Sequence, residues 1–214
     1  MTLFKCHHIN KNDSYINEVF YMNNIMNDKH IRPDAAQGPM AFSMVRSVST
    51  AKTIAEGADR VFYFDMDGCL AKWETVPVWR TKEPGFYLSR QPEQSLIRAL
   101  TILKEKGTQV AILSKAYTNG YAGPEKIEWL QRNGLGGIRT ILVPYGSSKL
   151  DYILSFGEAV VISDFSEELH ECERAGVQGV KFYNGLNGNH GTWHGPYITY
   201  LMNEFQIVNA LSAL

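Results

Sequence analysis

The chain has 214 residues, of which 44% are hydrophobic and 20% are charged, and its formal net charge at pH 7 is −1. This composition is typical of a globular protein with one well-buried core, with or without an appendage. The balanced charge argues against a nucleic-acid-coating surface and against an acidic solvating tail, because each would require an excess of one sign.

Cysteine usage and hydropathy indicate the compartment. Cys6, Cys69 and Cys172 are widely spaced and include no CxxC pair, which fits a reducing compartment better than a disulfide framework. The first residues lack the apolar segment of a signal peptide, and no apolar run reaches the ~20 residues that span a bilayer. We therefore expect a cytoplasmic protein with no membrane partner and no nucleic-acid polymer as ligand. A homo-oligomer is compatible with the sequence, which leaves the oligomeric state open.

Residues 1–57 are expected to form an N-terminal helical extension. Apolar residues recur at helical spacing in residues 41–56, and residues 15–26 are a second candidate helix. Apolar stripes of this kind most often cover a sheet, so we favour that interpretation. An oligomer interface or an interaction element is the alternative.

Residues 58–195 alternate short apolar runs with amphipathic segments, which is typical of βαβ units. The expected strands are residues 61–64, 109–113, 140–143, 159–162 and 179–182. The expected helices are residues 94–106, 124–133, 149–156 and 167–175, the last with Ser166 as its N-cap. The pattern predicts an α/β, Rossmann-like fold with a mostly parallel five-stranded sheet and helices on both faces. Residues 196–214 are expected to add a C-terminal helix, with an apolar stripe over residues 196–208.

Two aspartates, Asp65 and Asp67, directly follow the first apolar strand, and Gly68 comes next. Two carboxylates at the end of a buried strand require compensation, normally by a metal or another cation. The carboxyl ends of parallel strands are also where ligands bind. We therefore interpret the pair as catalytic rather than as a solvated charge cluster.

Three further polar residues stand at expected element boundaries: Ser114, Lys149 and Asp164. In a parallel sheet they are expected to converge with the aspartate pair in one pocket. The set suits phosphoryl transfer, since one carboxylate can attack phosphorus, a second can protonate the leaving alcohol, and hydroxyl and ammonium groups can bind phosphoryl oxygens. Asp65 and Asp164 also offer the hard oxygen ligands that Mg²⁺ prefers.

The DxDG segment that begins at Asp65 resembles motif I of the haloacid dehalogenase-like (HAD) superfamily, and the three later residues follow in the order of its motifs II, III and IV. The resemblance covers roughly residues 58–195. It implies a phosphatase with these roles: nucleophile and Mg²⁺ ligand for Asp65, general acid/base with a metal-binding carbonyl for Asp67, phosphate binding for Ser114, stabilisation of the phosphorylated state for Lys149, and Mg²⁺ binding for Asp164.

Residues 162–166 and 179–193 are similar to cytosolic-type 5′-nucleotidases, the type C deoxyribonucleotidase group. This similarity implies a small phosphorylated substrate such as a nucleoside 5′-monophosphate. Where such proteins often carry paired acids, this chain has Ser163 before Asp164, and the missing charge is expected to weaken Mg²⁺ binding or shift metal preference. The alternatives are a phosphatase or phosphotransferase for a sugar phosphate or phosphoprotein, and a non-catalytic binding protein of the same fold.

A short flap or cap is expected at residues 71–92, which are too few for a large cap domain. Its aromatic residues are Trp73, Trp79, Phe86 and Tyr87. Aromatic rings near a phosphate site can stack on a nucleobase. We favour the interpretation that they pack the flap against the core, because aromatic side chains bury the most apolar surface.

Overall fold

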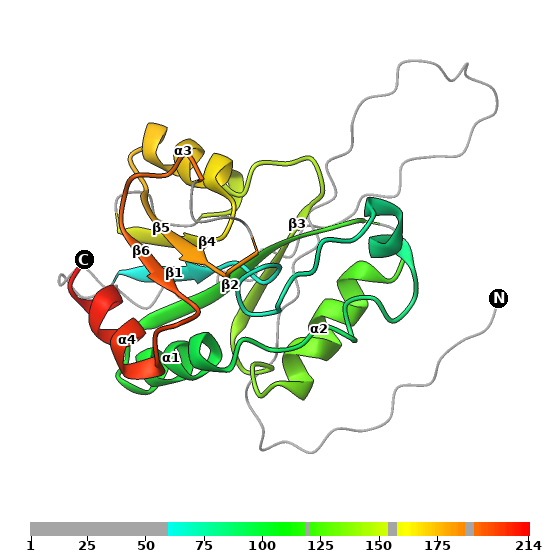
Figure 1. Ribbon diagram of the computed structural model, residues 1–214, viewed down its shortest axis with the longest axis horizontal. Helices are drawn as coiled ribbons and strands as arrows, with labels where there is room; N and C mark the ends of the chain where they lie inside the picture. Colours follow the sequence, from blue (N-terminus) through cyan, green and yellow to red (C-terminus); the bar gives the residue numbers. More distant parts are fainter. Residues whose placement is uncertain (1–59, 119, 154–157, 187–190) are drawn as a thin grey trace, which may run out of the picture. The chain divides into compact units, whose positions relative to one another are not determined.

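The computed structural model describes residues 60–118, 120–153, 158–186 and 191–214 (Figure 1). The helices expected within residues 1–57 lie outside these ranges. Six strands form one sheet in the order β3-β2-β1-β4-β5-β6, and every neighbouring pair is parallel. The strands are β1 (Val61–Phe64), β2 (Gln109–Ala116), β3 (Arg139–Pro144), β4 (Ala159–Ser163), β5 (Gln178–Tyr183) and β6 (Tyr197–Thr199).

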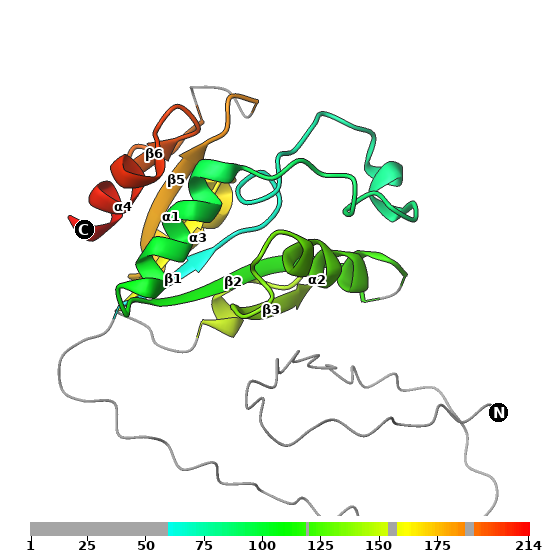
Figure 2. The ribbon, with the colours of Figure 1, turned by 90° about the horizontal axis from the view of Figure 1, so that it is seen from below.

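Helices cover both faces of the sheet, as predicted. α1 (Gln94–Glu105), α2 (Ala122–Arg132) and α4 (Glu204–Ser212) pack against one face, and α3 (Ser166–Arg174) packs against the other with the short 3-10 helix η2 (Leu150–Tyr152). In Figure 2, α1 lies in front of the sheet and α3 lies behind it. The predicted α/β, Rossmann-like class is therefore confirmed. None of the helices in the described ranges has the length and apolar character needed to cross a membrane.

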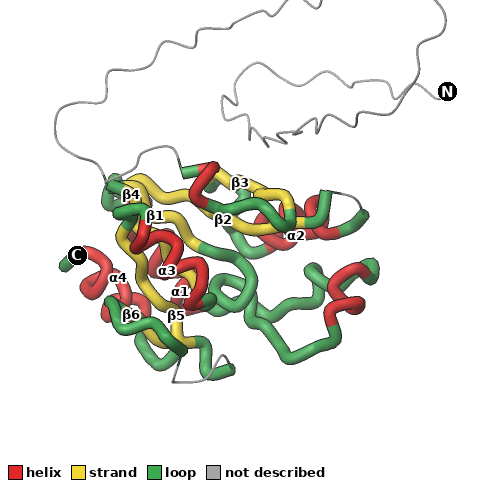
Figure 3. Tube along the Cα trace, turned by 90° about the horizontal axis from the view of Figure 1, so that it is seen from above, coloured by secondary structure: helices red, strands yellow, loops and turns green. Residues whose placement is uncertain are grey.

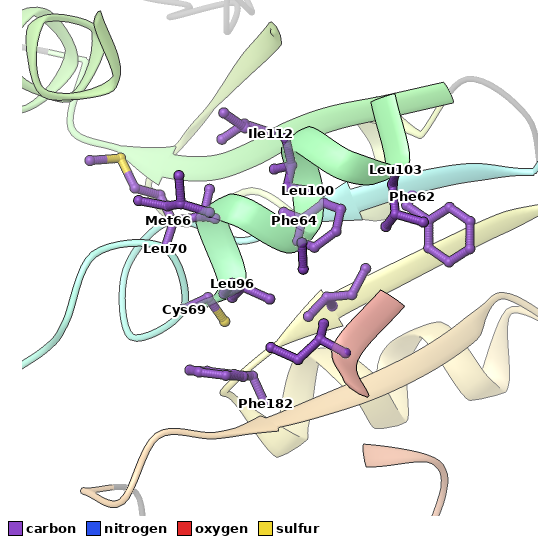
Figure 4. Close-up of a cluster of buried hydrophobic side chains, with 14 of the residues drawn as sticks. Phe62, Phe64, Met66, Cys69, Leu70, Leu96, Leu100, Leu103, Ile112 and Phe182 are labelled. Carbon is purple, nitrogen blue, oxygen red and sulfur yellow. The ribbon is translucent and has the colours of Figure 1, made fainter. Parts of the chain in front are cut away.

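The core follows from the alternation of side chains along β1. Phe62 and Phe64 point to the face covered by α1, where they join Leu96 and Leu100 (Figure 4). Tyr63 points to the opposite face and packs with residues of β2, β3 and β4. Because both faces of β1 are buried, its sequence is continuously apolar, as is typical of a central parallel strand.

The C-terminal segment differs from the prediction. Residues 196–208 are predicted to be helical, but Tyr197–Thr199 forms β6 at the edge of the sheet. The sheet therefore has six strands rather than the predicted five. The tyrosine, isoleucine and threonine of β6 suit a strand. α4 begins only at Glu204, because Asn203 and Gln206 form a reciprocal capping box there.

Three smaller boundaries also differ. Of the helix expected at residues 149–156, residues 154–156 lie outside the described ranges, and Leu150–Tyr152 forms the 3-10 helix η2 with Lys149 as its N-cap. Ser166 is the first residue of α3 rather than its N-cap, and its hydroxyl accepts a hydrogen bond from Lys181 Nζ at 2.9 Å. α2 begins at Ala122, so Pro124 lies inside its first turn, where the missing N–H costs little.

The segment 71–92 leaves and rejoins the core at one point, because Ala71 bridges both Asp67 and Pro92. Figure 3 draws the segment as loop on either side of the short 3-10 helix η1 (Val78–Lys82). Phe86 is buried and meets Trp73 edge to face, with ring centroids 5.5 Å apart. The favoured packing interpretation therefore holds for these two rings, whereas Trp79 is 62% exposed.

Candidate active site

A pocket of about 480 Å³ lies where β1, β2 and β4 end. Four of the five predicted residues line it: Asp65, Asp67, Lys149 and Asp164. The fifth, Ser114, is fully buried within β2. The expected convergence at the carboxyl end of a parallel sheet is thus observed for four residues.

The loop after β1 is anchored in the core, which orients the aspartates. Met66 and Leu70 are fully buried and point into the apolar cluster (Figure 4). Asp65 continues the ladder, since its N–H donates to the carbonyl of Ile162 at 2.9 Å. Because the side chain of Met66 packs into the core, the side chains of Asp65 and Asp67 on either side of it line the pocket.

The carboxylate of Asp65 is held on both oxygens. Its Oδ1 accepts the backbone N–H of Met66 at 2.7 Å, and its Oδ2 lies 2.7 Å from Lys149 Nζ. Burial raises the pKa of Asp65 to about 6, against the opposing effect of Lys149, and the charge of Glu168 adds to the rise. At neutral pH this carboxylate is mainly ionised and poorly solvated, which are the properties of a nucleophile.

Glu168 is a site residue that the sequence analysis did not single out. Its Oε2 lies 2.8 Å from Lys149 Nζ, and its Oε1 lies 2.9 Å from Lys115 Nζ. Burial alone would raise the pKa of Glu168, but the two lysines lower it below its ordinary value. Likewise, burial would lower the pKa of Lys149, but Asp65 and Glu168 raise it. Both groups are therefore charged and fix each other's position.

Ser163 occupies the position at which the 5′-nucleotidases that this segment resembles often carry a second acid. It is fully buried, and its hydroxyl lies 3.1 Å from Glu168 Oε2 and 3.4 Å from Asp65 Oδ2. The same oxygen accepts the N–H of Phe165 at 3.1 Å. The hydroxyl thus links the carboxylates of Asp65 and Glu168 without adding negative charge.

Lys126 on α2 is a second residue that the sequence analysis missed. Its ammonium contacts Oδ2 of Asp67 and donates to Ser114 Oγ at 2.9 Å. The predicted phosphate-binding hydroxyl is therefore engaged by a buried lysine behind the pocket wall. The role of Ser114 toward phosphate stays a prediction.

Asp164 lies against the turn that follows Asp67. Asn184, from the loop after β5, donates to Asp164 Oδ2 at 3.1 Å and to the carbonyl of Gly68 at 2.9 Å. Gly68 has a φ of +77°, and a Cβ at this position would overlap the carboxylate of Asp164. Only glycine permits this approach. Burial, and next the charge of Asp65, raise the pKa of Asp164 to about 7.

The donor set fits a hard cation. Asp65 is buried and Asp164 is partly buried, and the charge of Asp65 raises the pKa of Asp164, so a cation between the two carboxylates would relieve that repulsion. Within the described ranges, no group of three or more His, Cys, Asp or Glu side chains has the arrangement of a metal site. Two carboxylates with the backbone carbonyl of Asp67 correspond to an ion that keeps several waters, as Mg²⁺ does.

Solved structures resemble this chain, although no protein-family model and no curated protein sequence matches it. D,D-heptose 1,7-bisphosphate phosphatase from B. bronchiseptica, complexed with magnesium and phosphate, is 13% identical with a TM-score of 0.53, over 72% of this chain and 98% of that chain. A HAD-superfamily hydrolase of subfamily IA from Geobacter sulfurreducens is 13% identical with a TM-score of 0.49, over 73% and 98%. The heptose bisphosphate phosphatase from Burkholderia thailandensis is 14% identical with a TM-score of 0.48, over 72% and 97%. Of these three structures, the B. bronchiseptica phosphatase has a TM-score above 0.5, and its likeness to this chain is one of fold.

Proposed function

We propose that this protein hydrolyses phosphate monoesters with the help of Mg²⁺, through an aspartyl-phosphate formed on Asp65. The observation that carries the proposal is that Asp65, Asp67, Lys149 and Asp164 line one pocket at the carboxyl end of the sheet. The likeness to phosphatases of HAD-like fold supports the same reaction class.

The first half of the reaction is nucleophilic substitution at phosphorus. A carboxylate oxygen of Asp65 forms a bond to phosphorus while the ester P–O bond breaks, and Asp67 gives a proton to the departing alkoxide. The ammonium of Lys149, already 2.7 Å from Asp65 Oδ2, stabilises the negative charge that develops on the phosphoryl oxygens. In the second half, Asp67 takes a proton from water as the water oxygen bonds to phosphorus, the bond between Asp65 and phosphorus breaks, and inorganic phosphate leaves.

Mg²⁺ would be held by the carboxylates of Asp65 and Asp164 and the backbone carbonyl of Asp67. When bound, it reduces the repulsion between an anionic nucleophile and an anionic substrate. Two residues of the chain place the carboxylate of Asp164. Asn184 donates a hydrogen bond to it, and Gly68, which has no Cβ, leaves space for it.

The mouth of the pocket favours a substrate with a planar leaving group. Tyr117 and Tyr145 line it as a stacked pair, with ring centroids 4.6 Å apart and an interplanar angle of 28°. Trp73 and Phe165 also line the pocket. A nucleoside 5′-monophosphate combines a phosphate for the charged floor with a base that stacks on such rings. We therefore infer nucleoside monophosphates as the preferred small metabolites, ahead of sugar phosphates and phosphoproteins.

Hydrolysis of p-nitrophenyl phosphate with Mg²⁺ tests the proposal. The native chain should hydrolyse this substrate, and Asp65→Asn should lower the rate of hydrolysis at least ~100-fold, because it removes the nucleophile. Asp151→Asn is the matched control, since Asp151 is an exposed aspartate outside the pocket lining. Equal rates for the native chain and Asp65→Asn would exclude Asp65 as nucleophile. A panel of nucleotides, sugar phosphates and phosphopeptides then ranks the substrate classes by kcat/KM.

A further inference from the structure

The buried ammonium of Lys126 stands out among the charged groups around the pocket. Its side chain is fully buried, whereas the side chain of Asp67 that it contacts is 26% exposed. Lys126 Nζ donates to Asp67 Oδ2, to Ser114 Oγ at 2.9 Å and to the carbonyl of Lys115 at 2.6 Å. An ammonium has three N–H groups, so all of its donors are used within the protein. Lys126 therefore has no donor left for a substrate.

The contact is asymmetric, because Asp67 depends on Lys126 more than Lys126 depends on Asp67. The other carboxylate oxygen, Asp67 Oδ1, makes no hydrogen bond to any part of the chain that the structure describes. Lys126 thus supplies the side-chain hydrogen bond that orients Asp67, while two further acceptors on β2 keep the ammonium in place. Charge-assisted hydrogen bonds of this kind are strong and directional.

The lysine is itself held rigidly by α2 and the flap. Its ammonium lies 4.7 Å from the centroid of the Tyr87 ring. The preceding residue, Glu125, accepts the backbone N–H groups of Gly85 at 2.5 Å and Tyr87 at 3.1 Å. One turn of α2 thereby joins the flap to the loop after β1. The position of Lys126 is determined by both segments.

We propose that Lys126 is a positioning residue, which holds the carboxyl group of Asp67 in place for proton transfer to the leaving-group oxygen. The inference rests on the proposed function, in which a proton passes from Asp67 to the alkoxide as the P–O bond breaks. Without Lys126, the carboxyl group of Asp67 loses its orienting hydrogen bond, and the proton donor moves away from the oxygen that needs it. Esters whose leaving group must be protonated should therefore depend on Lys126 most.

The test compares two substrates on Lys126→Met. An alkyl phosphate monoester needs a proton on its leaving group, whereas p-nitrophenolate leaves without one. We expect kcat/KM to fall by ~100-fold for the alkyl ester, because general acid catalysis contributes at least that factor. For p-nitrophenyl phosphate, kcat/KM should fall no more than about three-fold, because this constant reports the steps through formation of the aspartyl-phosphate. In an Asp67→Asn background, Lys126→Met should cause no further loss on the alkyl ester.

Leu130→Ala is the matched control, because Leu130 lies on the same helix, is buried in the core and does not line the pocket. General destabilisation lowers kcat/KM for both substrates by the same factor, and this is the result expected for the control. Lys126→Arg keeps the charge and serves if Lys126→Met does not fold, and it should restore part of the alkyl-ester activity. Equal losses on the two substrates, or an additive loss with Asp67→Asn, would overturn the positioning role. The proposed function itself fails on a different result, namely an inactive native chain or an unaffected Asp65→Asn.

Discussion

The ammonium of Lys149 lies 2.7 Å from Oδ2 of Asp65, and neither side chain is more than 9% exposed. Two opposite charges at this distance in a poorly solvated site stabilise each other strongly, provided that both remain paired. Glu168 completes the arrangement, with its Oε2 at 2.8 Å from the same ammonium. Lys149 is therefore the shared counter-ion of a buried pair of carboxylates, in addition to facing the pocket.

Replacing Lys149 with methionine should damage both stability and turnover. Asp65 and Glu168 would be left buried with less compensation, and loss of one partner of a buried pair costs ~3 kcal/mol in the free energy of unfolding. Turnover should fall at least ~100-fold, because a donor to the phosphoryl oxygens is lost. Urea unfolding and p-nitrophenyl phosphate assays measure the two effects. Lys104→Met is the control, since Lys104 is exposed and lies outside the pocket lining, where it donates to the carbonyl of Gly137 at 2.9 Å. A comparable loss there would contradict the prediction.

Substituting Gly68 with alanine should separate backbone strain from damage to the site. Gly68 has a φ of +77°, and the new Cβ would overlap Asp164. Gly107 has a φ of +86°, yet a Cβ there meets nothing within 4 Å. Both substitutions should lower the free energy of unfolding by ~1 kcal/mol through strain. Only Gly68→Ala should also weaken Mg²⁺ binding, measured by calorimetry; equal Mg²⁺ affinities in the two variants would show that the displacement of Asp164 does not matter.

The stabilising effect of Mg²⁺ should increase with pH. The pKa values of Asp65 and Asp164 are raised from 3.8 to about 6 and about 7. Since the folded protein then retains protons that the unfolded chain releases, the metal-free protein loses stability from these groups as pH rises from about 4 to about 7. Mg²⁺ binds the deprotonated carboxylates, so it competes with protons over the same range.

Thermal unfolding at about pH 5.5 and about pH 8, with Mg²⁺ or with EDTA, measures this linkage. The gain in Tm from Mg²⁺ should be larger at the higher pH. Asp164→Asn removes one titrating ligand and should reduce both the gain and its pH dependence. A gain that is the same at the two pH values would contradict a site built on these two carboxylates.

The parts of the site that could be predicted are those that depend on local sequence. Asp65, Asp67 and Asp164 each follow an apolar strand closely, and a parallel sheet brings such positions to one edge. Lys126 and Glu168 gave no such signal, because each lies inside an amphipathic helix among other charged residues. Their burial depends on contacts with distant segments, which periodicity does not reveal.

The same distinction explains the error at the C-terminus. Ile198 and Leu201 have the spacing of an apolar helical face, but Tyr197–Thr199 pairs with β5 instead. A run of three residues is too short for its period to distinguish a strand from a helix. The free edge of β5 decided the outcome, and that edge exists only once the sheet has formed.

The aromatic mouth of the pocket should contribute to substrate binding through the leaving group. Tyr145 is 63% exposed and stacks on Tyr117, so it can present a face to a planar base. Tyr145→Ala should raise KM for a nucleoside monophosphate by about ten-fold, since stacking on an aromatic side chain is worth ~1–3 kcal/mol per base. KM for a sugar phosphate should change little, because it offers no planar aromatic base to stack. Steady-state kinetics on both substrates provide the measurement.

Tyr197→Ala is the matched control for this prediction. Tyr197 is similarly exposed, at 55%, and also belongs to a tyrosine pair, with Tyr183 at a centroid distance of 5.3 Å. It does not line the pocket, so its loss should leave KM for both substrates unchanged. If Tyr145→Ala raised KM for the sugar phosphate as much as for the nucleotide, the ring would act on the common phosphate end of the substrate. The preference for a planar leaving group would then lose its structural basis, although hydrolysis through Asp65 would stand.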